Sequence, residues 1–233
     1  MKTILATLCL LVSAFGQTIQ ITDGSPGDSP LKFKGTITFG AEVTCEVTGH
    51  NDGSRMIVAW VAQLQVVRPD GQTFSEPFTN DHFFKNDQII AMMSPKPGLD
   101  FDVQLSCAAY HHKNYVATPQ SPSMMIAAKL VQFDDGSVWG EATAAKELAF
   151  QRQDAVAYLQ SLKAAGDLTK ALVQEPAYSN ERGSDNHVRW ETLITWKHLS
   201  EDPTPEAKAA DLDNRLSIAE AHKAWLERLA TGQ

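Results

Sequence analysis

The residues of this chain best suited to hold a metal ion are three loop histidines. His111 and His112 follow one predicted strand, and His82 follows Asp81 in another loop. If the two loops converge, imidazole and carboxylate groups would suit zinc or copper. Adjacent histidines usually point in different directions, so solvated loop residues are the more common outcome of such a pattern. A thiolate metal site or redox site would need Cys-x-x-Cys spacing or nearby histidine ligands at metal spacing, and the sequence has neither.

Four aspartates offer a second kind of chemistry. Asp100 and Asp102 share one face of a predicted strand, and Asp134 and Asp135 fall in a predicted turn. Paired carboxylates can hydrolyse glycosidic bonds or bind calcium. However, the alternation places Asp102 toward solvent, and no Asp-x-Asp-x-Asp-Gly loop is present. Turn and surface roles are therefore favoured for these four residues.

Aromatic residues gather around the same loops. Phe83 and Phe84 follow the first loop histidine, while Tyr110 and Tyr115 lie on either side of the histidine pair. Exposed rings can stack on sugars or anchor a protein partner. Packing at the edge of the core is the more common outcome, because phenylalanine is mostly buried.

The sequence contains no motif typical of a known catalytic or nucleotide-binding site. We find no Gly-x-Ser-x-Gly, no His-Glu-x-x-His, no P-loop and no Gly-x-Gly-x-x-Gly after a predicted strand. The net charge is −8, and neither half of the chain is basic, which disfavours binding to nucleic acid. We therefore expect no cofactor and no nucleic-acid partner, and binding is favoured over catalysis.

The first 16 residues have the pattern of a secretory signal peptide. A basic start at Lys2 precedes the apolar run Ile4–Val12, and small residues follow at Ala14 and Gly16. The run is too short to cross a bilayer, which takes about 20 residues. We expect a protein that is secreted or periplasmic after cleavage, with two cysteines left in an oxidising compartment.

Alternating apolar and polar residues predict a β-rich first half. Residues 42–48, 56–66 and 101–107 alternate with Cys45, Trp60 and Cys107 on their inward faces. Further strands are expected near residues 18–22, 31–38, 72–78, 88–93 and 123–133. Seven or eight short strands separated by turn residues are typical of a β-sandwich.

The spacing of these three inward residues resembles that of immunoglobulin-type domains. Trp60 lies 15 residues after Cys45, and Cys107 lies 62 residues after it. The resemblance implies an inter-sheet disulfide between the two cysteines, packed against the tryptophan. It also implies an antiparallel sandwich over residues 17–140. A disulfide closing such a loop stabilises by about 4 kcal/mol in the chain-entropy model.

A second, weaker resemblance covers residues 131–140 and the Ala/Glu-rich stretch that follows. The run Val-Gln-Phe-Asp-Asp-Gly-Ser-Val-Trp-Gly is similar to one in a group of uncharacterised secreted bacterial proteins. The resemblance implies no activity. Asp134 to Ser137 within it predicts a tight turn.

From residue 141 onward the composition predicts helices. One helix is expected from Ala142 to a stop at Gly166, and another from an N-cap at Thr204 through Pro205 to Ala230. Residues 188–199 fit helix or strand, with helix favoured by the surroundings. Three tryptophans are expected in the core between the helices and the sandwich, namely Trp190, Trp196 and Trp225.

Together these patterns predict an α+β protein in three parts: a signal peptide over 1–16, an immunoglobulin-like sandwich over 17–140 and a helical region over 141–233. The favoured function is a secreted, non-catalytic interaction module with an unknown protein or glycan partner. Alternatives are a carbohydrate-binding or hydrolytic protein that uses loop aromatics and carboxylates, and a metal-binding protein that uses the loop histidines.

Overall fold

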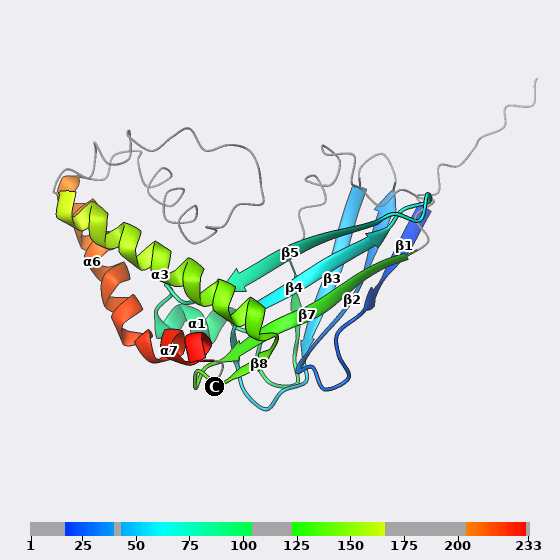
Figure 1. Ribbon diagram of the computed structural model, residues 1–233, viewed down its shortest axis with the longest axis horizontal. Coiled ribbons are helices and arrows are strands. Elements are labelled where there is room, and N and C mark those ends of the chain that lie inside the picture. The colour runs from blue at the N-terminus through cyan, green and yellow to red at the C-terminus, as the bar shows by residue number, and fades with distance from the viewer. Residues whose placement is uncertain (1–16, 40–42, 104–122, 166–203, 232–233) are drawn as a thin grey trace, which may run out of the picture.

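The computed structural model describes residues 17–39, 43–103, 123–165 and 204–231. They form one curled, mixed β-sheet followed by C-terminal helices (Figure 1). The elements in chain order are β1 (Gln17–Asp23), β2 (Leu31–Phe39), β3 (Val43–Asn51), β4 (Ile57–Val67), β5 (Thr73–Asp81), α1 (Asp87–Met93), β6 (Asp100–Asp102), β7 (Ser123–Phe133), β8 (Val138–Gly140), α3 (Ala142–Ala165), α6 (Pro205–Ala221) and α7 (Lys223–Thr231).

The strands run in the order β5-β4-β7-β1-β2-β3-β6, and β8 pairs with β7 off this path. The β1–β7 pair is parallel, with Ile21 opposite Met124, and the other pairs are antiparallel. The predicted two-sheet sandwich is therefore wrong. β1 pairs with β7 on one side and with β2 on the other, and so joins what a sandwich would keep as two sheets.

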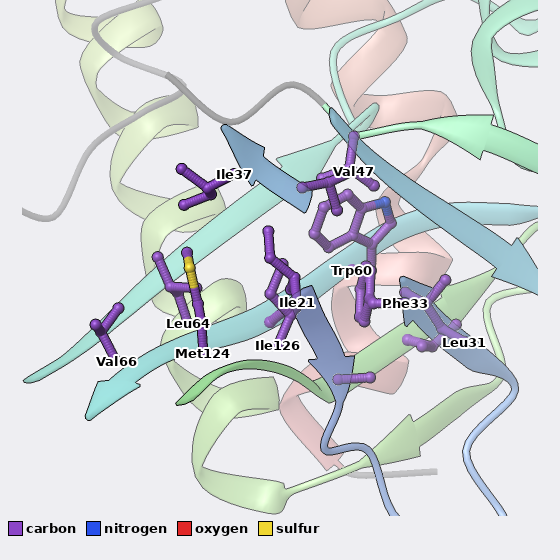
Figure 2. Packing of buried hydrophobic residues seen from close by; sticks show 14 of the residues in the cluster. Ile21, Leu31, Phe33, Ile37, Val47, Trp60, Leu64, Val66, Met124 and Ile126 are labelled. Atoms are coloured by element: carbon purple, nitrogen blue, oxygen red, sulfur yellow. The ribbon is translucent and has the colours of Figure 1, made fainter. Parts of the chain in front are cut away.

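The curl of the sheet encloses an apolar core. Side chains from β1, β2, β3, β4 and β7 point toward one another on the concave side (Figure 2). Trp60 is 3% exposed there and meets Phe78 edge-on, with ring centroids 5.3 Å apart. Its indole nitrogen has no hydrogen-bond partner among the described residues. Cys45 packs against the same core, but Cys107 lies outside the described residues, so the disulfide stays a prediction.

A short helix, α1, replaces the strand predicted at residues 88–93, and that prediction is wrong. The apolar pairs Ile89-Ile90 and Met92-Met93 fit either element. The local signal that decides is Asn86, whose side-chain oxygen accepts a hydrogen bond from the Ile89 amide at 3.0 Å. Such an N-cap satisfies an amide that the first helical turn would otherwise leave unpaired.

The tight turn after β7 is confirmed. The Phe133 amide donates to the Ser137 carbonyl, and Gly136 adopts a φ of +83°, which glycine reaches without a steric penalty. This turn forms the β7–β8 hairpin, and α3 begins two residues after it. The predicted order of strands followed by C-terminal helices is likewise confirmed.

The helices α3, α6 and α7 group at one end of the sheet (Figure 1). Thr204 caps α6 and Pro205 occupies its first turn, as the sequence predicts. The single helix predicted to continue to Ala230 is instead interrupted at His222, where φ is −94° and ψ is 13°. This break redirects the chain so that Leu226 and Leu229 of α7 pack against β4, β7 and α3. No helix among the described residues is long and apolar enough to cross a membrane.

Candidate functional site

The connection from α1 to β6 is the part of the described structure that most resembles a contact surface. We call residues 87–100 the α1–β6 segment. Ile90 anchors it in the protein with 3% of its surface exposed. The Ser94 amide closes α1 by donating to the Ile90 carbonyl at 2.9 Å. Because Pro95 and Pro97 follow, the helix cannot continue.

Asn51, at the end of β3, holds the second half of this segment in place. Its buried side chain donates to the Pro95 carbonyl at 2.9 Å and to the Arg55 carbonyl at 2.8 Å. Its own carbonyl accepts from Gly98, and its amide donates to the Leu99 carbonyl. The segment is therefore tied to the sheet by backbone and side-chain bonds at several points.

Three large apolar side chains of this well-anchored segment nevertheless lie in solvent. Met92 is 75% exposed, Met93 is 56% exposed and Leu99 is 54% exposed. Isolated exposed apolar residues are ordinary, but three within eight residues of one connection are a local concentration. Thioether side chains adapt their shape to an apolar partner. Because the backbone is already ordered, little conformational entropy would be lost on binding.

Three histidines contact this segment from other parts of the fold. His222 places Nε2 3.6 Å from an Asp87 carboxylate oxygen, and His82 places Nδ1 2.7 Å from the Ser94 hydroxyl. His50 places Nδ1 2.6 Å from an Asp100 carboxylate oxygen. Hydrogen bonds from His50 and Lys34 hold the pKa of Asp100 below its ordinary value of 3.8.

A second polar arrangement lies at the helix–sheet joint, which we define as the contact between α3, α7 and the ends of β5 and β7. Arg152 of α3 is fully buried and forms a two-pronged ion pair with Asp81. Nε donates to one carboxylate oxygen at 2.9 Å and Nη2 to the other at 2.7 Å. The guanidinium also lies over the Phe83 ring, with Cζ 4.6 Å from its centroid.

The remaining polar groups of the joint are also bonded within the protein. Arg152 Nη1 donates to the Gln132 side chain at 2.7 Å, and Gln132 donates to the Trp225 carbonyl at 2.9 Å. The Phe83 amide donates to Asp81 at 3.0 Å. His222 bonds the Phe83 carbonyl at 2.8 Å through Nδ1 and stacks on Trp225. Since these groups are directed at one another, we interpret the joint as structural and not as a reaction centre.

The residues predicted for a metal or aromatic site are only partly described. His82 and Phe83 are buried at 4% and 1% exposure, and Phe84 is half-buried against α3 and α6. Asp100 and Asp102 are exposed on β6. The other predicted site residues lie outside the described residues, namely Tyr110, His111, His112 and Tyr115. Within the described ranges, no group of three or more potential metal ligands is brought together.

The sequence predictions passed over Arg152 and the exposed methionines. Arg152 does carry a signal, because it lies four residues after Leu148 and seven before Leu159, on the apolar face of α3. A charged residue on such a face requires a buried partner. The exposure of Met92 and Met93 had no comparable signal, because their pattern suits a buried strand equally well.

No protein-family model, curated protein or solved structure matches the chain.

Proposed function

We propose that the protein is a non-catalytic binding module whose α1–β6 segment contacts an apolar surface of another protein. The observation that carries this proposal is the exposure of Met92, Met93 and Leu99 on a segment tied to the sheet by Asn51. Exposed apolar side chains on an ordered backbone favour binding to another protein. Their burial contributes affinity, and the backbone loses little conformational entropy on binding.

A protein partner suits these side chains better than a glycan does. Sugar recognition relies on exposed aromatic rings and hydrogen-bonding side chains. Phe83, a candidate for such stacking, is instead buried under Arg152, and the large apolar side chains that the segment exposes include no aromatic ring. Tyr110 and Tyr115 remain predictions for glycan binding, as do His111 and His112 for a metal ion.

We further propose that the module acts outside the cytoplasm. The support is the signal-peptide pattern of residues 1–16, followed by a chain with two cysteines.

Selection from a displayed peptide library would test the contact surface. The probe is a random peptide library panned on the immobilised protein and, in parallel, on a Met92→Ser/Met93→Ser/Leu99→Ser variant. We expect the wild-type protein to enrich peptides rich in apolar residues, and the variant to retain these peptides at least tenfold less well. Such a loss corresponds to about 1.4 kcal/mol.

A matched control is provided by Phe150 on α3, which is 61% exposed and lies outside the segment. A Phe150→Ser variant removes a large exposed apolar side chain, and it should retain the selected peptides. Equal retention by the triple variant and the wild-type protein would contradict the proposal. Circular dichroism of all variants would show that folding is unchanged.

A further inference from the structure

The methionines of the described structure differ sharply in their exposure to solvent. Met92 and Met93 are adjacent at the end of α1, with 75% and 56% of their surface exposed. Met124 lies in the concave core with 1% exposed (Figure 2). Met125 is half-buried, and its sulfur lies where a side chain at position 24 would go, which is free because Gly24 has none. The α1–β6 segment therefore carries the two most exposed methionines among the described residues.

A thioether differs from other apolar side chains because it is readily oxidised. A hydroperoxide such as hydrogen peroxide transfers one oxygen to the sulfur, so that an S–O bond forms and the O–O bond breaks. The proton on the transferred oxygen passes to the departing hydroxide, which leaves as water. The sulfur loses two electrons and the peroxide gains them. The product, methionine sulfoxide, is polar, and its formation requires that the oxidant reach the sulfur.

We propose that Met92 and Met93 are an oxidation site, at which a hydroperoxide weakens the contact between the α1–β6 segment and its apolar partner. The oxidation site stands on exposure, whereas the weakened contact rests on the proposed function. Each sulfoxide places a polar oxygen on the surface that the partner would cover, and burying such a group without a donor is unfavourable. The fold should not change, because the buried side chains of Ile90 and Asn51 anchor the segment and contain no sulfur.

Mass spectrometry of the full chain treated with hydrogen peroxide would test the oxidation site. The protein is digested after increasing times, and the oxidised fraction of each methionine is followed. We expect Met92 and Met93 to be oxidised at least about tenfold faster than Met124, with the half-buried Met56 and Met125 in between. Rates at the two exposed positions no higher than the rate at Met124 would overturn the proposal. This measurement needs no binding partner.

A Met92→Leu/Met93→Leu variant is the matched control for the weakened contact, because leucine keeps the apolar surface and has no sulfur. Peroxide treatment should reduce the retention of the selected peptides by the wild-type protein about tenfold, as polar groups replace apolar ones. The leucine variant should retain them equally before and after treatment. An equal loss in both proteins would place the effect elsewhere in the chain and overturn the proposal.

The same comparison separates this proposal from the proposed function. If the oxidised wild-type protein still retains peptides that the triple serine variant loses, the contact surface stands and the effect of oxidation is wrong. If the wild-type protein enriches no apolar peptides, the proposed function fails and the weakened contact fails with it. The oxidation rates then decide the oxidation site by themselves.

Discussion

The concave core of the sheet and the helix–sheet joint are both buried, but they are filled by different kinds of side chain. The concave core is built from large aliphatic and aromatic side chains that alternate along each strand. At the joint, α3 presents Leu148 together with the small side chains of Ala145 and Ala149 toward Ala59 and Leu130. Alanine contributes far less apolar area than leucine or isoleucine. The joint adds a buried ion pair and a hydrogen-bonded glutamine, Gln132, to an apolar cluster that is smaller than the concave core.

The difference shows that buried apolar area and directional polar contacts contribute differently to the fold. Apolar burial stabilises the curl of the sheet but tolerates shifts, because it is not directional. The two-pronged contact of Arg152 with Asp81 is satisfied in one geometry only, so it fixes where α3 lies along the sheet. We hypothesise that the ion pair contributes more to the position of the helices than to net stability.

The largest expected effect comes from breaking that ion pair on one side. Arg152→Met leaves the Asp81 carboxylate buried without its cation, and should lower the free energy of unfolding by about 3–5 kcal/mol. Urea denaturation followed by circular dichroism measures this change. The Asp81→Asn/Arg152→Met double variant should lose much less than the single variant. A double variant as unstable as Arg152→Met alone would show that the pair adds large net stability.

A core substitution should have a somewhat smaller effect. Leu64 is fully buried on the concave side, and Leu64→Ala should cost about 3 kcal/mol through lost burial and a cavity. Combined with Arg152→Met, the two costs should add within about 0.5 kcal/mol, because Leu64 belongs to the concave core, whereas Arg152 bonds to Asp81 and Gln132 outside it. A larger deviation, measured in the same urea titrations, would show that core and joint act as one unit.

A substitution at the N-terminus of α6 tests the stability of this helix separately from that of the helix–sheet joint. The Thr204 hydroxyl accepts from the Ala207 amide at 3.3 Å, so Thr204→Ala should cost about 1 kcal/mol. Thr204→Ser keeps the oxygen and should cost less. Tryptophan fluorescence and far-UV circular dichroism should shift together if helices and sheet unfold as one. Separate transitions would indicate that the helices detach first.

The smallest effect is expected at the β7–β8 turn. Burial raises the pKa of Asp135, but bonds from Ser137 and the charges of Arg55 and Arg228 outweigh it and lower the pKa below 3.8. Since the pKa is lower in the folded protein, the carboxylate stabilises the fold above pH 3.8, and this contribution is lost as the pH falls further. Asp135→Asn should therefore cost up to about 1 kcal/mol at neutral pH and nothing in strong acid. Equal costs at both pH values, in thermal denaturation, would contradict this assignment.

The strands and turns could be predicted largely from sequence, whereas their assembly could not. Period-two alternation located β3 and β4, and turn residues located the hairpin after Phe133. Alternation states which side chains face inward, but it does not state which strand lies alongside. The spacing of Cys45 and Trp60 suits a sandwich and a curled sheet equally well. The parallel pairing of β1 with β7 decides between them and leaves no local signature.

The candidate site was less accessible to sequence reasoning for two physical reasons. The exposure of Met92 and Met93 depends on tertiary contacts, because Ile90 alone turns α1 toward the protein interior. The break at His222 follows from a stacking contact with Trp225 and a bond to a distant carbonyl. Neither contact appears in the helical pattern of the segment. By contrast, the N-caps Asn86 and Thr204 are local sequence signals. Thr204 was predicted from the sequence, and Asn86 could have been predicted in the same way.

The central position of β1 has a consequence for how the chain assembles. Its partner β7 lies about 100 residues further along, so the middle of the sheet cannot close until that later strand has been synthesised. Bringing such distant segments together carries a loop-closure cost before any contact repays it, which slows folding. A chain interrupted before Ser123 would therefore hold β1 against β2 on one edge, with its other edge bare and prone to pair with a neighbouring molecule.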